Sequence, residues 1–225
     1  MGWRDDLVVN LNRLWPDVVE TSGWKSRGNG SSWAVNGAPV ATMNHHLVVP
    51  ATQQYEPISR DMAISGYTGL PGPICNTMIA ADGTIYLIAG NPANHAGMGR
   101  SEVRDRVMSN RAPLGNAADV YGSGDNWGSG NTHYFGMEAQ HPGDLSMWPD
   151  IQIRAIYAWN AAVLSTLGFP AERAIHHREH SPRKRDMSWS GDLRAGVRLT
   201  MNGTIQPPPV IIQPNPSWLG RLLRK

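Results

Sequence analysis

Three observations predict an α/β fold for this chain of 225 residues. Short apolar segments with the character of β-strands alternate along the sequence with segments of helical spacing. The hydrophobic content of 40% is sufficient for one buried core. The 24 glycines and 17 prolines indicate that much of the chain lies in loops. We therefore expect one α/β domain with a short appendage.

The first part of the chain is expected to hold a helix, a loop and a strand. A short amphipathic helix is predicted over residues 4–15, where apolar residues recur at helical spacing: Leu7, Val8, Leu11 and Leu14. Residues 21–38 are rich in Gly, Ser and Asn and are predicted to be a loop. Residues 38–43 are predicted to form a short strand that leads directly into His45 and His46.

A β-hairpin is predicted near the middle of the chain. Residues 74–80 and 84–88 are apolar, and the Asp-Gly dipeptide between them is a strong turn signal. A helix is expected over residues 100–109. The polar, Gly-rich stretch 112–131 is expected to be a long loop, and loops of this length are often functional.

The second half of the chain contains the clearest helix. A strand is predicted over residues 132–139, and a helix over 147–167, which Gly168 terminates. Its core-facing residues are Ile156, Trp159, Val163 and Leu167. A short strand over 174–176 and a last helix over 189–199 complete the predicted elements.

Charge, cysteine content and hydropathy exclude several classes of protein. The net charge of +2 and the pI near 8.9 suit an anionic partner but are too weak to indicate a nucleic-acid-binding protein. The single cysteine, Cys75, cannot form an internal disulfide. No apolar run approaches the roughly 18 residues of a membrane span, and the N-terminus lacks the apolar core of a signal peptide.

Histidines and a carboxylate follow two of the predicted strands. The pairs His45-His46 and His176-His177 stand at strand ends, and Asp186 follows nine positions after His177. A catalytic zinc site takes three nitrogen or oxygen ligands from the protein and leaves one position open. Such side chains could converge on a metal, although a histidine pair is more often a surface or core feature than a ligand.

The segment 175–186 resembles the last motif of the type-2 N-acetylmuramoyl-L-alanine amidases, the superfamily of phage endolysins, bacterial amidases and peptidoglycan recognition proteins. In that motif a His, an acidic residue and a Pro precede a basic stretch that ends in a ligand Asp or Cys. The matching residues here are His177, Glu179, Pro182, Lys184 and Asp186. The loop from Pro182 to Asp186 is one residue shorter than in many members.

Other segments resemble the same superfamily in the expected order, so that the resemblance covers roughly residues 38–200. These segments are Met-Asn-His-His at 43–46, the hairpin at 75–86, Asn-His-Ala-Gly at 94–97 and the strand at 134–138. The resemblance implies a central, mostly mixed β-sheet flanked by helices. Cys75 replaces a Tyr that some branches carry before the hairpin, which shifts catalysis to the carboxylate of the strand.

The resemblance implies a zinc ion held by His45, His177 and Asp186. Because residue 44 is Asn where most members have an apolar residue, His45 and His46 both stay open as the first ligand. A ligand histidine usually donates its other ring N–H to a carboxylate or a carbonyl, and Glu179 is a candidate for that role.

The resemblance also implies the chemistry. Glu138 would act as the general base and later as the acid toward the leaving amine. Lys184 would stabilise the oxyanion that forms at the amide carbonyl. Asn94 and His95 would lie in the substrate groove. The reaction implied is zinc-dependent hydrolysis of the amide between N-acetylmuramic acid and L-alanine.

Two other functions stay open at this stage. A non-catalytic peptidoglycan-binding protein would use the same fold, and a zinc peptidase that cuts within the stem peptide would use a similar metal. The expected partner is peptidoglycan, with no nucleic acid, and the expected state is a monomer. A lysis enzyme of this kind would be made in the host bacterial cytoplasm without a signal peptide and would act at the cell wall after release.

Three segments are expected along the chain. Residues 1–37 form the N-terminal helix and loop of the catalytic unit, and residues 38–204 form the zinc amidase domain. Residues 205–225 form a Pro-rich linker and a short basic amphipathic tail. Within this tail, residues 217–225 could make a weak contact with a membrane or the wall.

Overall fold

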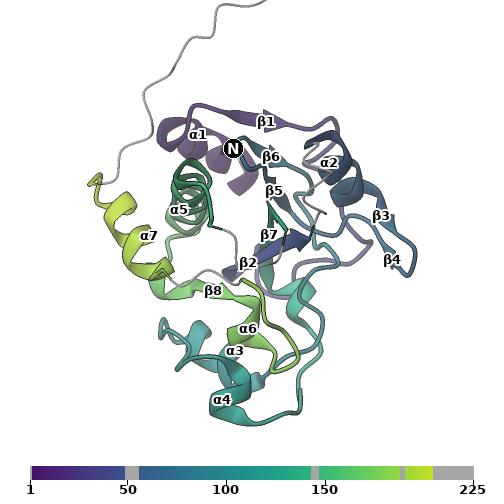
Figure 1. Cartoon of the computed structure of the whole chain (residues 1–225), viewed down its shortest axis with the longest axis vertical. Coiled ribbons are helices and arrows are strands. Elements are labelled where there is room, and N and C mark those ends of the chain that lie inside the picture. Colours follow the sequence, from purple (N-terminus) through teal and green to yellow (C-terminus); the bar gives the residue numbers. More distant parts are fainter. Residues whose placement is uncertain (1, 49–55, 143–146, 188–190, 205–225) are drawn as a thin grey trace, which may run out of the picture.

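The computed structural model describes residues 2–48, 56–142, 147–187 and 191–204 of the chain. Its centre is a sheet of six strands (Figure 1). In order across the sheet, the strands are β1 (Val18–Glu20), β6 (Ile85–Leu87), β5 (Thr77–Ile79), β7 (Tyr134–His141), β2 (Ala41–Val48) and β8 (Ala174–His176). Strands and helices alternate along the chain, so the predicted α/β class is confirmed.

The sheet is mixed, as expected. Strands β5 and β6 form the predicted antiparallel hairpin, and the remaining neighbours pair in parallel. Gly83 in the hairpin turn has φ +88°, and a Cβ there would lie 2.9 Å from Cγ1 of Ile151. Glycine therefore lets the turn fold back closely against the start of a helix.

Within the described residues, three helices cover one face of the sheet, and the main hydrophobic core lies between them and the sheet. Helix α5 (Asp150–Leu167) is the predicted long helix and ends at Gly168 in the left-handed conformation. Helix α1 (Trp3–Leu14) packs on α5, and α7 (Leu193–Met201) packs on its other side (Figure 1). The Trp159 ring of α5 stacks on Phe135 of β7, with the ring centroids 6.1 Å apart.

Smaller elements cover the opposite face and the β8 edge. Helix α2 (Glu56–Ser65) contacts β5 and β7, and a small hairpin of β3 (Gly66–Tyr67) and β4 (Leu70–Pro71) follows it. The other short elements are α3 (Ser101–Met108), α4 (Ala117–Tyr121), η1 (Gly130–Thr132), η2 (Ala171–Arg173) and α6 (His177–His180). None of the helices within the described ranges is long and apolar enough to cross a membrane.

Several elements differ from the sequence prediction. Strand β1, helix α2 and the β3–β4 hairpin were not predicted, because short strands and partly polar helices give weak periodicity. The predicted loop 112–131 contains the helical turns α4 and η1. The last helix starts at Leu193 rather than at 189, since the Asp192 side chain accepts a hydrogen bond from Ala195 N and caps it. Residues 189–190 and the tail 205–225 lie outside the described residues.

A buried polar contact ties α5 to β2. The side chain of Asn160 donates to Asn44 Oδ1 at 2.8 Å and accepts from Thr42 Oγ1 at 2.6 Å. All three residues are fully buried. The contact therefore fixes the position of the strand that carries His45.

Substitution Asn160→Ala should destabilise the protein by about 2–4 kcal/mol, because the buried atoms Thr42 Oγ1 and Asn44 Oδ1 lose their hydrogen-bond partner. Urea denaturation followed by circular dichroism measures the loss. The matched control is Asn10→Ala, which removes one partly buried hydrogen bond to Thr166 and should cost about 1 kcal/mol or less. Equal losses in the two variants would contradict the role of the buried contact.

Candidate active site

Parallel pairing brings three predicted site residues together on one face of the sheet. His45 of β2 is in register with Glu138 of β7, and Asn44 is in register with His176 at the end of β8. His177 begins helix α6 directly after β8. The loop after α6 carries Asp186, whose carbonyl accepts from Arg178 N at 2.8 Å. Residues that are far apart in sequence therefore meet beside the end of β8. The prediction that His45 and His46 follow a strand over 38–43 is wrong, because both lie within β2.

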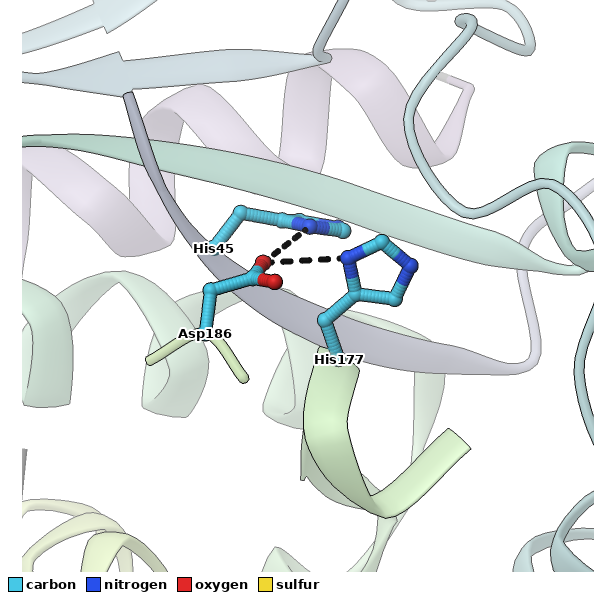
Figure 2. A group of neighbouring side chains, drawn as sticks. All are labelled: His45, His177 and Asp186. Atoms are coloured by element: carbon cyan, nitrogen blue, oxygen red, sulfur yellow. Dashed lines mark hydrogen bonds and ion pairs between the residues drawn. The ribbon is translucent and has the colours of Figure 1, made fainter. Parts of the chain in front are cut away.

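His45, His177 and Asp186 point toward one another (Figure 2). Oδ2 of Asp186 lies 3.1 Å from Nδ1 of His45 and 3.0 Å from Nδ1 of His177. The three ligand atoms lie within 4.8 Å of one another. Both histidine side chains are 2% exposed, and Asp186 is 17% exposed. One open side of the cluster therefore reaches solvent.

The hydrogen bonds made by Nε2 of His45 and of His177, on the side of each ring away from Asp186, determine which ring nitrogen carries the proton. Nε2 of His95 lies 2.9 Å from the carbonyl oxygen of Tyr134, which can only accept, so this nitrogen carries a proton. Neutral His95 then has a bare Nδ1, 3.0 Å from Nε2 of His45, which must donate to it. Nε2 of His177 likewise donates to the Ala96 carbonyl at 3.2 Å. In their neutral forms, His45 and His177 therefore both turn a bare Nδ1 toward Asp186.

Two imidazole lone pairs and a carboxylate that face one point form a site for a cation. Burial, together with the nearby His177, lowers the pKa of His45 to about 4, so its ring is neutral at pH 7. Burial alone would raise the pKa of Asp186, but its interactions with His177 and His45 outweigh burial and lower it. The carboxyl group is therefore ionised, as a metal ligand must be.

The donor set and its spacing fit zinc. Zinc binds His nitrogen and Asp oxygen at about 2.0–2.2 Å in tetrahedral geometry, which places two ligand atoms roughly 3.4 Å apart. The separations of 3.0 and 3.1 Å are close to that value. Three protein ligands leave a fourth position for water or substrate, as in catalytic zinc sites.

Glu138 lies on the same face of the sheet beside His45. Its Oε2 atom is buried and has no hydrogen-bond partner among the described residues. Burial and the nearby Asp186 raise the pKa of Glu138 well above its ordinary value, while Lys184 opposes the shift. A carboxyl group in this state can hold a proton near neutral pH and exchange it with a substrate.

Two adjoining cavities run past the cluster. The first, of about 520 Å³, is lined by His45, Glu138, His177 and Asp186 on one side. Its other side is apolar and comes from α2, the β3–β4 hairpin and the end of β2: Leu47, Val48, Met62, Tyr67, Leu70 and Ile74. The second, of about 600 Å³, has a mixed lining that includes the polar side chains of Asn131 and Arg183. Both cavities share Leu70, Asn94, His95 and Lys184, so together they form one long groove.

The structure therefore brings all seven predicted site residues to one groove. Asn94 is tied into the surrounding loops, donating to Pro71 O and accepting from Asn29. His95 lines the groove but also contacts His45, a role that the sequence did not predict. His46 lines the first cavity but is not part of the cluster, and its ring centroid lies 6.1 Å from that of His141 and 6.2 Å from that of Trp148. The geometry thus favours His45 over His46 as the first ligand.

The expectation that Glu179 supports a ligand histidine is wrong. Its carboxylate accepts from His176 N at 2.8 Å and from Arg194, and it does not reach the ring of His177. Glu179 is three residues from the cap of α6, so its carboxylate completes a capping box there. The Ala96 carbonyl, and not Glu179, accepts the hydrogen bond from the His177 ring. No sequence pattern could have identified this partner, because it is a backbone group.

Comparisons with known proteins agree with this geometry. The sequence profile of the N-acetylmuramoyl-L-alanine amidase family Amidase_2 matches residues 36–189. The solved structure of a selenomethionine derivative of AmpD is similar over 82% of this chain and 93% of that chain, with a TM-score of 0.54 and 18% identity. No curated protein sequence matches the chain.

Two further solved structures match less closely. The endolysin amidase LysCS from Clostridium intestinale has a TM-score of 0.45 and 18% identity, over 84% of this chain and 98% of that one. Drosophila PGRP-LB has the same TM-score and identity, over 84% of this chain and 95% of its own.

The fold is the one seen in the AmpD structure, and the family profile matches most of the chain. Because the family profile covers more than half of the chain, the protein belongs to the N-acetylmuramoyl-L-alanine amidase family.

Substitution His45→Ala should reduce zinc bound after dialysis to a substoichiometric level, because it removes one of three ligands. The neighbouring variant His46→Ala should retain zinc, since that ring lies outside the cluster. Metal analysis of the two purified variants measures the difference. Zinc retained by His45→Ala and lost by His46→Ala would reverse the assignment.

Proposed function

We propose that this protein is a zinc-dependent amidase that hydrolyses the bond between N-acetylmuramic acid and L-alanine of peptidoglycan. The observation that carries the proposal is the convergence of His45, His177 and Asp186 beside Glu138, in a chain of the amidase family. A zinc ion held by these ligands would supply Lewis acidity, which activates water and polarises an amide carbonyl.

Glu138 transfers the proton in the proposed reaction. Its unpartnered Oε2 takes a proton from the attacking water as the new C–O bond forms at the lactyl carbonyl. When the C–N bond breaks, the same carboxyl group gives that proton to the nitrogen of L-alanine. Its raised pKa suits both steps, because the group must hold the proton between them.

Lys184 supplies positive charge to the amide carbonyl. It lies on the loop that carries Asp186 and lines both cavities, at the place where they join. A cation at this point favours the negative charge that develops on the carbonyl oxygen, an effect typically worth about 3 kcal/mol of barrier. Asn94 and His95 line the same stretch of the groove and would contact the substrate beside the scissile bond.

We assign the activity to a lysis enzyme of the phage endolysin type, on the basis of the sequence resemblance. Such an enzyme is made in the cytoplasm of the host and reaches the wall after release. It works as a monomer on a polymeric substrate. The basic residues of 217–225 would add a weak contact to the wall or membrane; this segment lies outside the described residues.

Substitution Glu138→Gln should lower the turnover number by about 10²- to 10⁴-fold, because an amide cannot transfer the proton. Zinc content should stay at the wild-type level, since Glu138 is outside the ligand set. Release of free amino groups from purified peptidoglycan, with parallel metal analysis, measures both. Wild-type turnover in this variant would remove Glu138 from the mechanism.

Digestion of purified peptidoglycan should give intact glycan strands and free peptides that begin with L-alanine. Mass spectrometry of the digest identifies the bond cut, and a zinc chelator should stop the reaction until zinc is restored. Cleavage within the stem peptide would instead indicate a zinc peptidase. Binding to the wall without cleavage by the zinc-loaded protein would indicate a recognition protein.

A further inference from the structure

One asparagine holds the short segment that lies behind both ligand histidines. Oδ1 of Asn131 accepts hydrogen bonds from three consecutive backbone N–H groups: His95 N at 3.1 Å, Ala96 N at 2.8 Å and Gly97 N at 3.0 Å. Gly130 N also donates to the Gly97 carbonyl at 3.2 Å. The turn η1 and the segment 95–97 are thus joined by four hydrogen bonds.

Two adjacent residues of this segment are the outer partners of the ligand histidines. The His95 ring accepts from Nε2–H of His45, and the Ala96 carbonyl accepts from Nε2–H of His177. The His95 ring and the Ala96 carbonyl belong to consecutive residues, so they move together. A shift of this segment would therefore disturb both ligands at once.

Close packing leaves the His95 ring little freedom. Gly136 lies against it, and a Cβ at that position would be 2.4 Å from Nδ1 of His95. The ring can keep its bonds to His45 and to Tyr134 O only while the backbone of 95–97 stays in place. Asn131 Oδ1 accepts from all three N–H groups of that backbone and so helps to hold it in place.

We propose that Asn131 is a positioning residue for the zinc site. By fixing the segment 95–97, it aligns the acceptors that keep the proton of both ligand histidines on Nε2. Both Nδ1 atoms are thereby presented to the metal together with Asp186. The inference rests on the proposed zinc-dependent function but concerns a residue that contributes no ligand atom to the cluster.

The test compares zinc affinity in two variants at this position. Asn131→Ala removes the acceptor of three N–H groups and should raise the zinc dissociation constant by about 10- to 100-fold. This is the range typical of residues that hydrogen-bond to metal ligands. Asn131→Asp keeps an oxygen acceptor of the same length and should stay close to the wild-type constant. Competition with a chromophoric chelator gives both values. Equal weakening in the two variants, or none in either, would overturn the proposal.

A matched control comes from the same region of the chain. Asn126 Oδ1 accepts from Ser101 N at 2.7 Å, and its amide donates to Glu102, away from the ligand histidines. Asn126→Ala should leave zinc affinity unchanged. A loss as large as that of Asn131→Ala would show that general loosening of these loops, and not the alignment of the ligands, explains the effect.

A second measurement on the wild-type protein covers the case in which Asn131→Ala does not fold. Nitrogen-15 NMR of the zinc-loaded protein should show ring protons on Nε2 of His45 and His177, both protected from exchange with solvent. Protons on Nδ1 would overturn the positioning role while leaving a zinc protein in place. A wild-type protein that binds no zinc would overturn the proposed function itself, and the positioning role with it.

Discussion

The parallel register of β2 with its two neighbours is the constraint on which the site depends. It sets His45 beside Glu138 and brings the end of β8 level with Asn44, so that His177 emerges next to His45. A shift of one residue would turn His45 toward α5, because successive side chains of a strand point to opposite faces. The buried contact of Asn160 with Thr42 and Asn44 holds this register from the opposite face of the sheet.

The site also depends on the direction of its hydrogen bonds. Carbonyl oxygens at Tyr134 and Ala96 can only accept, and this fact decides which ring nitrogen carries the proton in the neutral forms of His95, His45 and His177. Burial keeps the His45 ring neutral, and the histidines in turn keep Asp186 ionised. Backbone carbonyls, which have no sequence pattern, thus set the tautomers of the histidines in the site.

The sequence predicted the parts of the site that strong local patterns carry. The two histidine pairs, the basic loop before Asp186 and the Asp-Gly turn identified the class of fold and the candidate ligands, although His45 lies within β2 and not at its end. Helix α2 and the β3–β4 hairpin contribute to the apolar wall of the groove, and the sequence did not predict them. The helix is partly polar, and two-residue strands have no detectable periodicity. The contacts of Asn131 and the Ala96 carbonyl could not be predicted either, since they depend on three-dimensional proximity across 34 to 81 residues of chain.

The tight packing at Gly136 has a consequence for anyone who wishes to redesign the substrate preference of this enzyme. A side chain there would meet the His95 ring at 2.4 Å, and one at Gly130 would meet Ala96 Cβ at 2.7 Å. Both glycines belong to the scaffold behind the ligands, although each is only a short distance along the chain from groove residues. A mutant library should therefore diversify the apolar wall at Met62, Tyr67 and Leu70 and leave these two positions unchanged.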